Sequence, residues 1–441
     1  MIGAFESTYQ PKHDIDIAET TQHVTRFDDD IALLRSCGVE SLRYPIRWHR
    51  VEPREGQFDW SDADRALGRL HDSGLHPIVD LVHHTSYPRW LAGGFADPRF
   101  RTAYLRYAEA VAARYPWVES YTLFNEPFST LFLCGHEAIW PPYHRGLETF
   151  LALLRNVLPA VSDASRMYQD LLPHAQHVYV DSCEHHQAAT AAGEEVTLLA
   201  NDRRFFVADV FLGRHLDTSR PFIAAVVAAG FDDLLGMPPG DVDILGLDYY
   251  AHCQWDYFAW DVGVVPSAHP MAFQDLIADY CHRYRLPCMV GETNIRGTPS
   301  DRASWFKYTL EQCEAARERG VDVVGYCWFP FVDSSDWDSL LFHCDGNIDP
   351  VGVYSLDPDL ERRASSMSDS FRLAATGASA AELPAYEFQQ PVATWMTGFR
   401  PYMAHWNWQP PRPEDHLLGT QPSGLRIELK IRDALDVEGR A

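Results

Sequence analysis

Two glutamates stand directly after apolar stretches of the chain, in positions that favour acid–base chemistry. Glu126 lies within Asn125-Glu126-Pro127, after the apolar residues 121–124, and Glu292 follows the apolar residues 288–291. Side chains at the carboxyl ends of parallel barrel strands meet in one pocket. Two opposed carboxyl groups in such a pocket suit cleavage of a glycosidic bond, because one can protonate the leaving oxygen while the other attacks the anomeric carbon.

The ends of other apolar stretches carry the polar and aromatic residues that such a reaction needs. An arginine beside the attacking carboxylate helps to keep it ionised, and the sequence offers Arg43 for this role. Polar side chains can hold sugar hydroxyls, and aromatic rings can stack on the apolar face of a sugar. The remaining candidates for substrate binding are Gln10, His84, Asn125, Tyr250, Trp328, Phe329, Asp336 and Trp337.

Eight short apolar stretches, each followed by a helix or a long connection, must position these residues. The stretches are 2–5, 41–46, 77–82, 121–124, 177–180, 244–249, 288–291 and 323–328. Nearly continuous apolar strands are typical of a parallel sheet that is covered on both faces. Eight such units predict an α/β fold, a (β/α)8 barrel. An open doubly wound sheet is the alternative, although the first stretch lacks the glycine-rich loop that such sheets usually carry.

Apolar periodicity and helix stop signals predict the helices between these strands. We expect helices at 27–37, 63–73, 100–114, within 148–172, and at 202–212, 271–284 and 303–319. The polar, alanine-rich residues 184–195 are expected to form a surface loop. The catalytic barrel is expected to span residues 1–376. Residues 377–441 form an extension whose tryptophans favour packing on the barrel or on a partner chain.

Composition excludes several other classes of function. The chain has 441 residues, a formal net charge of −25 and only three lysines, so it lacks the basic patches of a nucleic-acid binder. It also lacks an apolar run long enough to span a membrane. The nine cysteines show no disulfide or zinc pattern, and we see no signal peptide, so a reduced, cytoplasmic location is expected. The oligomeric state is open, a homo-oligomer included.

The motifs resemble those of family-one glycoside hydrolases, which include β-glucosidases and β-galactosidases. Asn125-Glu126-Pro127 looks like the signature of the larger clan of retaining barrel glycosidases. The likeness extends to residues 7–10, 42–48, 246–250, 325–337 and 353–357, and to His84 followed by Pro88. It implies that Glu126 is the acid/base and Glu292 the nucleophile. It also implies that Arg43 and Tyr250 support Glu292, that Asn125 holds the sugar 2-hydroxyl, that Gln10, His84 and Asp336 bind other hydroxyls, and that the aromatic residues form a platform.

Several positions depart from the family pattern and leave the specificity open. Asp248 replaces an asparagine, Asp336 replaces a glutamate, and the platform tryptophan falls on Phe329, with Trp328 one residue earlier. Thr85, Lys12 and the stretch Glu292-Thr293-Asn294 also differ from the family. The sugar, a small carbohydrate or glycoside such as a glucoside, galactoside, xyloside or fucoside, is therefore not defined.

Each signal also has a purely structural interpretation. Asn125-Glu126-Pro127 could start a helix, Arg43 could pair with a structural acid such as Asp80, and the histidine and aromatic residues could belong to the core. A catalytically silent sugar-binding barrel and a metal-dependent hydrolase barrel are the alternative functions, although no metal or cofactor is expected. Retention predicts two carboxyl groups about 5–5.5 Å apart, and inversion predicts about 6.5–9.5 Å.

Overall fold

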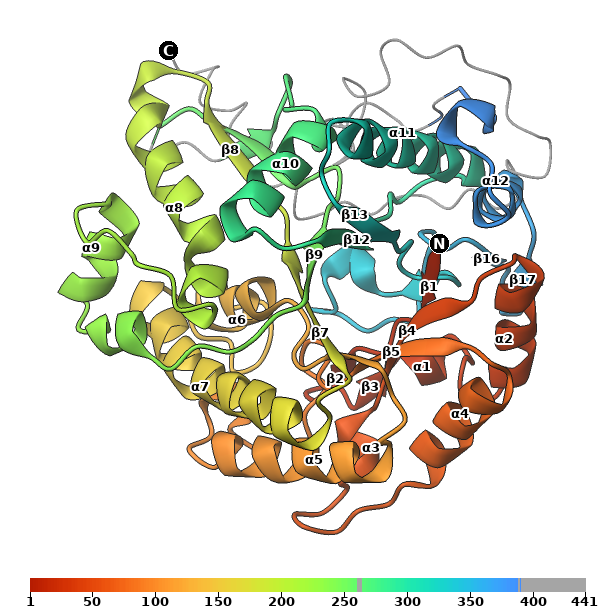
Figure 1. Cartoon of the computed structure of the whole chain (residues 1–441), viewed down its shortest axis with the longest axis horizontal. Coiled ribbons are helices and arrows are strands. Elements are labelled where there is room, and N and C mark those ends of the chain that lie inside the picture. The colour runs from red at the N-terminus through yellow and green to blue at the C-terminus, as the bar shows by residue number, and fades with distance from the viewer. Residues whose placement is uncertain (260–263, 388, 390–441) are drawn as a thin grey trace.

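Eight parallel strands form a barrel around the centre of the chain (Figure 1). The computed structural model describes residues 1–259, 264–387 and 389. In barrel order the strands are β1 (Ile2–Ala4), β4 (Ser41–Pro45), β5 (His76–Asp80), β6 (Ser120–Thr122), β7 (Gln176–Ser182), β9 (Ile244–Asp248), β12 (Cys288–Glu292) and β13 (Val323–Tyr326). A parallel bridge between Ile2 and Cys327 joins the last strand to the first. The predicted (β/α)8 barrel is therefore confirmed, and the open sheet is excluded.

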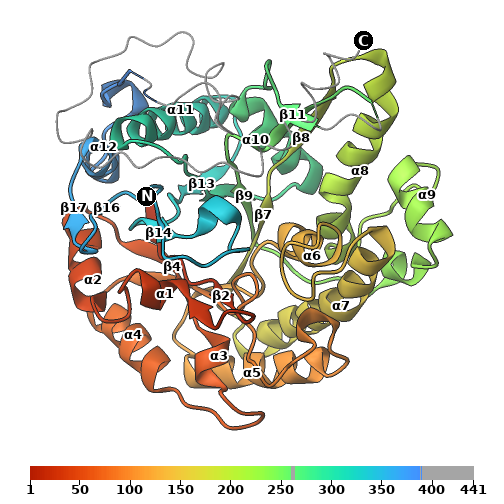
Figure 2. The same ribbon diagram turned by 180° about the vertical axis from the view of Figure 1, so that it is seen from behind.

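Helices surround the barrel on its outer side, as Figures 1 and 2 show from opposite directions. The main ones are α2 (Phe27–Ser36), α4 (Ser61–Asp72), α5 (Phe100–Arg114), α7 (Leu147–Leu171), α8 (Glu194–Phe211), α10 (Phe273–Tyr284), α11 (Pro299–Glu318) and α12 (Ser366–Ala375). Shorter helices lie in the connections: α1 (Ile17–Thr20), α3 (Trp48–Val51), α6 (Pro127–Gly135) and α9 (Pro221–Ala228). The expected helices are all present, although α8 begins eight residues before the predicted start at 202.

The expectation of a surface loop at 184–195 was wrong. Residues His185–Ala188 form β8, which pairs in parallel with β10 (Gln254–Tyr257). Strand β11 (Val264–Pro266) pairs with the other edge of β10 in an antiparallel sense. The polar composition of β8 hid this strand, because it lies outside the barrel and its partner is distant in the sequence. Three short antiparallel pairs complete the strands: β2 (Tyr9–Gln10) with β3 (Ile15–Asp16), β14 (Ser334–Ser335) with β15 (Ile348–Asp349), and β16 (Ser355–Leu356) with β17 (Arg362–Arg363).

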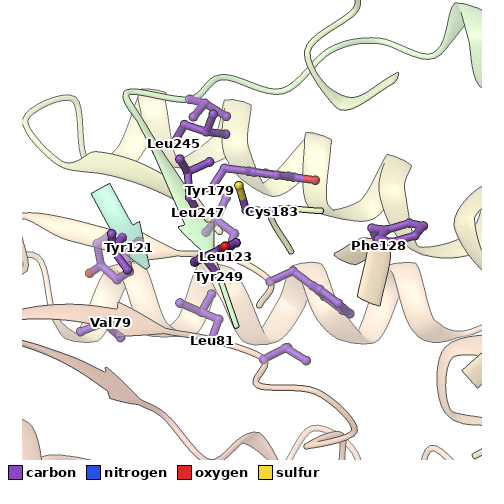
Figure 3. Packing of buried hydrophobic residues seen from close by; sticks show 14 of the residues in the cluster. Val79, Leu81, Tyr121, Leu123, Phe128, Tyr179, Cys183, Leu245, Leu247 and Tyr249 are labelled. Atoms are coloured by element: carbon purple, nitrogen blue, oxygen red, sulfur yellow. The ribbon is translucent and has the colours of Figure 1, made fainter. Parts of the chain in front are cut away.

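Alternation along the strands divides the buried residues into an inner and an outer set. The small inner cluster consists of Ala4, Ile78, Val178, Val180, Met289, Cys327 and Phe329. The large outer cluster fills the layer between strands and helices, and Figure 3 shows part of it. On β9, Leu245 and Leu247 belong to this outer cluster, so the intervening Gly246 and the following Asp248 face the barrel interior. The same alternation directs Arg43 of β4 inward, because Leu42 belongs to the outer cluster.

Cys281 and Cys288 form a disulfide, which corrects the expectation that the cysteines show no such pattern. Cys281 lies near the end of α10 and Cys288 begins β12, and their Cα atoms are 6.3 Å apart. The short connection between helix and strand brings the two residues together. The other seven cysteines are unpaired, and six of them are buried.

The first part of the C-terminal extension packs on α11. Leu383 and Tyr386 are buried, and the Lys307 ammonium group donates to the carbonyl oxygens of Ala380 and Leu383 at 2.5 and 2.9 Å. The expected role of Trp395, Trp406 and Trp408 lies outside the described residues. Within the described part of the chain, every helix is too short or too polar to cross a lipid bilayer.

Candidate active site

Glu126 and Glu292 lie close together inside the carboxyl end of the barrel. Glu126 sits in the turn between β6 and α6 with a left-handed backbone (φ 44°), and Pro127 begins the helix after it. Glu292 is the last residue of β12, where a register shift interrupts the pairing with β9. The two side chains are buried, and an oxygen of each lies within 4.8 Å of the other. A left-handed glutamate is strained, which is typical of residues whose side chains must point into a functional site.

Arg43 connects the two strand ends that carry these carboxyl groups. Its Nη1 donates to Oε1 of Glu292 at 2.7 Å and to the carbonyl oxygen of Gly291 at 3.1 Å. Its Nη2 donates to Oδ1 of Asn125 at 2.5 Å and lies 3.3 Å from Oδ2 of Asp80. The predicted alternative, a pairing of Arg43 with Asp80, is thus present together with the pairing to Glu292. The guanidinium group fixes Asn125 beside Glu126 and stabilises the negative charge of Glu292.

Tyr250 holds the second oxygen of Glu292. Its hydroxyl group donates to Oε2 at 2.8 Å. Burial and the nearby charges of Glu292 and Glu126 raise the pKa of Tyr250 well above its ordinary value, so the phenol keeps its proton and remains a donor. Both oxygens of Glu292 therefore accept hydrogen bonds, one from a cation and one from a neutral phenol.

The surroundings of Glu126 favour its protonated form. Burial, the negative charge of Glu292 and that of Asp181 raise the pKa of Glu126 well above its ordinary value, while Arg43 opposes the shift. His84 adds no positive charge, because burial and then the neighbouring His83 and Arg43 lower its pKa well below the ordinary value. One protonated and one ionised carboxyl group is the arrangement that an acid and a nucleophile require.

His84 forms one wall of the site together with two tryptophans. Its Nδ1 lies 3.1 Å from Oγ1 of Thr130 and 3.9 Å from Oε2 of Glu126. Its ring lies 4.9 Å from that of Trp140 and 5.4 Å from that of Trp337. Trp337 therefore lies beside His84 in the pocket, as the sequence predicted. Trp140 was missed, because it lies in the long connection between α6 and α7 with no strand end to mark it.

The two neighbouring aromatic residues after β13, Trp328 and Phe329, point to opposite sides of the barrel wall. Phe329 faces the barrel interior, stacks on His83 at 5.3 Å and lies under the Arg43 guanidinium group at 5.8 Å. Trp328 faces the opposite way, packs against Phe306 of α11 and donates its indole N–H to the carbonyl oxygen of Val351. The prediction that Trp328 binds substrate was therefore wrong, since adjacent residues of an extended chain point to opposite sides.

Asp336 and Gln10 both form hydrogen bonds with backbone groups of the loop that follows β14. The carboxylate of Asp336 accepts backbone N–H groups of its own loop, from Asp345 and Asn347 on one oxygen and from Gly346 on the other. These hydrogen bonds give Asp336 the task of shaping the loop, and its predicted contact with a sugar hydroxyl stays a prediction. Gln10 donates to the carbonyl oxygen of Leu341 at 3.4 Å. The indole N–H of Trp140 donates to the adjacent carbonyl of Leu340 at 2.6 Å.

Several buried groups in the site were not predicted as site residues. His83 bridges Oδ2 of Asp80 at 2.8 Å and Oε1 of Glu6 at 3.5 Å. Although burial opposes it, the hydrogen bond and charge of Asp80 raise the pKa of His83. Asp248 is fully buried, and one of its oxygens lies within 4.8 Å of oxygens of Glu126 and of Glu292. The sequence signal that could have identified Asp248 as a site residue is that it replaces an asparagine of the family pattern.

Comparison with known proteins identifies the family. The sequence profile described as "Glycosyl hydrolase family 1" matches residues 5–254. The chain belongs to glycosyl hydrolase family 1. A β-glucosidase of Agrobacterium sp. is 26% identical over 254 residues, which cover 54% of each chain. A bifunctional β-D-glucosidase/β-D-fucosidase of Bifidobacterium breve is 25% identical over 380 residues, or 73% of this chain and 81% of that one.

Solved structures agree on the fold of this family member. A Thermotoga maritima β-glucosidase in complex with azafagomine superposes with a TM-score of 0.69 at 17% identity, covering 81% of this chain and 86% of the other. In sequence, the chain spans about half the length, 54%, of the Agrobacterium and T. maritima enzymes that it matches. The resemblance to family-one glycoside hydrolases that the motifs indicated is confirmed.

Proposed function

We propose that this family member is a retaining β-glycosidase, with Glu126 as acid/base and Glu292 as nucleophile. The observation that carries the proposal is the close approach of two buried carboxyl groups, with oxygens within 4.8 Å, of which Glu292 alone is paired with Arg43. Oxygens this close are compatible with the short spacing of about 5–5.5 Å between carboxyl groups that is typical of retention.

The reaction takes place in two displacements. In the first, an oxygen of Glu292 attacks the anomeric carbon while Glu126 gives its proton to the leaving glycosidic oxygen, so the C–O bond breaks and a glycosyl ester forms. In the second, Glu126, now a carboxylate, takes a proton from water, whose oxygen attacks the same carbon and releases Glu292. Arg43 and Tyr250 stabilise the charge of Glu292 before attack and after release. Asn125, held by Arg43, presents its amide to the sugar 2-hydroxyl.

The sugar platform and the remaining hydroxyl contacts are part of the same proposal. His84, Trp337 and Trp140 form an aromatic wall beside Glu126, with Gln10 on the adjoining loop. The names of the relatives direct the first tests to β-glucosides and β-fucosides. The ligand is a small glycoside, and no metal or cofactor takes part in the steps above.

A panel of aryl β-glycosides tests the function. The wild type should release the phenol at a rate that exhaustive chelation does not change. Glu292→Ala should lose turnover and recover part of it with added azide, which replaces the missing nucleophile. Glu292→Asp is the matched variant, since it keeps the charge but moves it away from the sugar. Absence of turnover by the wild type across the panel, with tight sugar binding retained, would favour the silent sugar-binding barrel.

We also propose a cytoplasmic location for the chain. The support is that seven of the nine cysteines are unpaired, six of them buried, since proteins of oxidising compartments usually pair their cysteines. Cell fractionation followed by immunoblotting should find the chain together with cytoplasmic marker proteins. Recovery of the chain in an extracytoplasmic fraction would contradict the proposal.

A further inference from the structure

Asp248 is a third carboxyl group in the catalytic pocket. It ends β9, it is fully buried, and one of its oxygens lies within 4.8 Å of oxygens of Glu126 and Glu292. Neither of its oxygens has a hydrogen-bond partner among the described residues. The side chain lies against Gly291, where any larger residue would collide with Oδ1. The glycine before the nucleophile thus makes room for this carboxyl group.

Arg43, the cation of the pocket, forms its hydrogen bonds with groups other than Asp248. The two terminal nitrogens of Arg43 donate to Glu292, Gly291, Asn125 and Asp80, and none of these bonds reaches Asp248. A buried carboxylate without a donor or a paired cation is strongly destabilised, and two like charges at this separation raise the cost further. A neutral carboxylic acid at the same place carries no such cost and has an O–H group to donate.

We propose that Asp248 is a positioning residue that acts as a neutral carboxylic acid, holding its proton beside Glu292 and Glu126. This inference rests on the proposed glycosidase function. Its consequence is that the three carboxyl groups carry one negative charge, which resides on the nucleophile. An ionised Asp248 would instead repel the charge of Glu292 and hold the proton more firmly on Glu126, which must release it to the leaving group.

The groups around Asp248 are consistent with this state. Burial, then the charges of Glu292 and Glu126, raise its pKa well above the ordinary value, while Arg43 opposes the shift and Asp181 adds to it. The titratable groups that face it are Glu292 of β12, Glu126 after β6, Arg43 of β4, Asp181 of β7, Cys183 after β7, Cys327 after β13, and Tyr250 and Cys253 of its own loop. Apart from Arg43, these groups are acidic or neutral.

Infrared difference spectroscopy tests the protonation state without requiring activity. The comparison uses full-length Glu126→Gln, in which the acid/base contributes no carboxyl band, and the same chain with Asp248→Asn added. At neutral pH the added substitution should remove one band of a protonated carboxylic acid. Asp256→Asn is the matched control, since this buried aspartate lies on β10 outside the barrel, and it should leave that band in place. Identical spectra with and without Asp248→Asn would overturn the proposal.

The pH profile of kcat/KM tests the positioning role. Asp248→Asn should keep the alkaline limb at the pH of the wild type, because a neutral side chain then replaces a neutral one. If Asp248 is ionised in the wild type, Asp248→Asn will move the alkaline limb down by about one pH unit, which would also overturn the proposal. Asp248→Ser is a second neutral variant if the asparagine variant does not fold. A wild type without glycosidase activity would refute the proposed function, while the infrared result would still decide the state of Asp248.

Discussion

The Arg43 guanidinium group lies 2.7 Å from Oε1 of Glu292, although β4 and β12 are not neighbours in the barrel. This ion pair crosses the barrel interior, where both side chains are only 2% exposed. The position of the Glu292 carboxyl group therefore depends on a residue 249 positions earlier in the chain, which only the closed barrel brings close. A buried ion pair of this kind is costly to break, because the remaining charge has no water to replace its partner.

Replacing Arg43 by lysine should lower kcat/KM by about 100-fold or more, since one ammonium group cannot reach Glu292 and Asn125 together. Steady-state kinetics on an aryl β-glycoside would measure the loss. Arg302→Lys is the control, because Arg302 is equally buried but pairs with Asp333, away from the carboxyl pair. It should lower the melting temperature with little effect on kcat/KM. Equal kinetic losses in the two variants would indicate a structural rather than a catalytic role for Arg43.

The alkaline limb of the pH profile should report Glu126. The acid must be protonated to act, and burial together with the charge of Glu292 raises the pKa of Glu126 well above its ordinary value. Activity is therefore retained as the pH rises past the range of an ordinary glutamate, and it falls when the pH passes the raised pKa. In Glu126→Ala, with an aryl substrate whose leaving group needs no proton, the alkaline limb should disappear. If the alkaline limb of the pH profile is unchanged in this variant, another residue is the general acid.

The sequence was sufficient for the barrel and for the residues at strand ends. Apolar runs and helix stop signals are local, so the eight strands and the helices around them followed from short windows of sequence. The positions of Arg43, Tyr250 and Glu292 followed from the barrel itself, because parallel strands place their carboxyl ends on one face. These residues lie together in the structure as expected.

What the sequence did not provide depends on contacts between distant residues. The register of β13 decides whether Trp328 or Phe329 faces the pocket. A shift of the strand by one residue would turn Trp328 inward and Phe329 outward. Asp336 turned out to organise a loop, which depends on the backbone N–H groups of residues about ten positions later. Strand β8 exists only because β10 pairs with it, and its polar composition gave no local sign of this.

Asp181 should make the stability of the folded chain depend on pH. Burial raises its pKa from 3.8 to about 7, although the N–H groups of Phe128 and Ser129 at the start of α6 favour the charged form. The folded state thus binds this proton more tightly than the unfolded state does. The stabilisation is fully present below about pH 4 and is lost as the pH rises through 7.

Substitution Asp181→Asn should flatten this part of the pH dependence. Urea unfolding at several pH values between 4 and 8 would measure it as a smaller decline in the free energy of unfolding than in the wild type. Asp256→Asn is a matched control, since Asp256 lies on β10 and accepts its hydrogen bonds from Gln187 and Ala268. A decline that Asp181→Asn leaves as steep as in the wild type would show that another group binds the proton.

The start of the C-terminal extension should contribute to the stability of the barrel. Leu383 is buried, its carbonyl oxygen accepts a hydrogen bond from Lys307, and the nearby Tyr386 carbonyl accepts one from Ser304 at 2.9 Å. Leu383→Ala in the full chain should lower the free energy of unfolding by about 2–5 kcal/mol, the range for removing a buried leucine side chain. Leu373→Ala is the matched control, because Leu373 on α12 is 42% exposed, and it should change stability by less than about 1 kcal/mol. If the two variants unfold at the same urea concentration, the extension adds nothing to the barrel through Leu383.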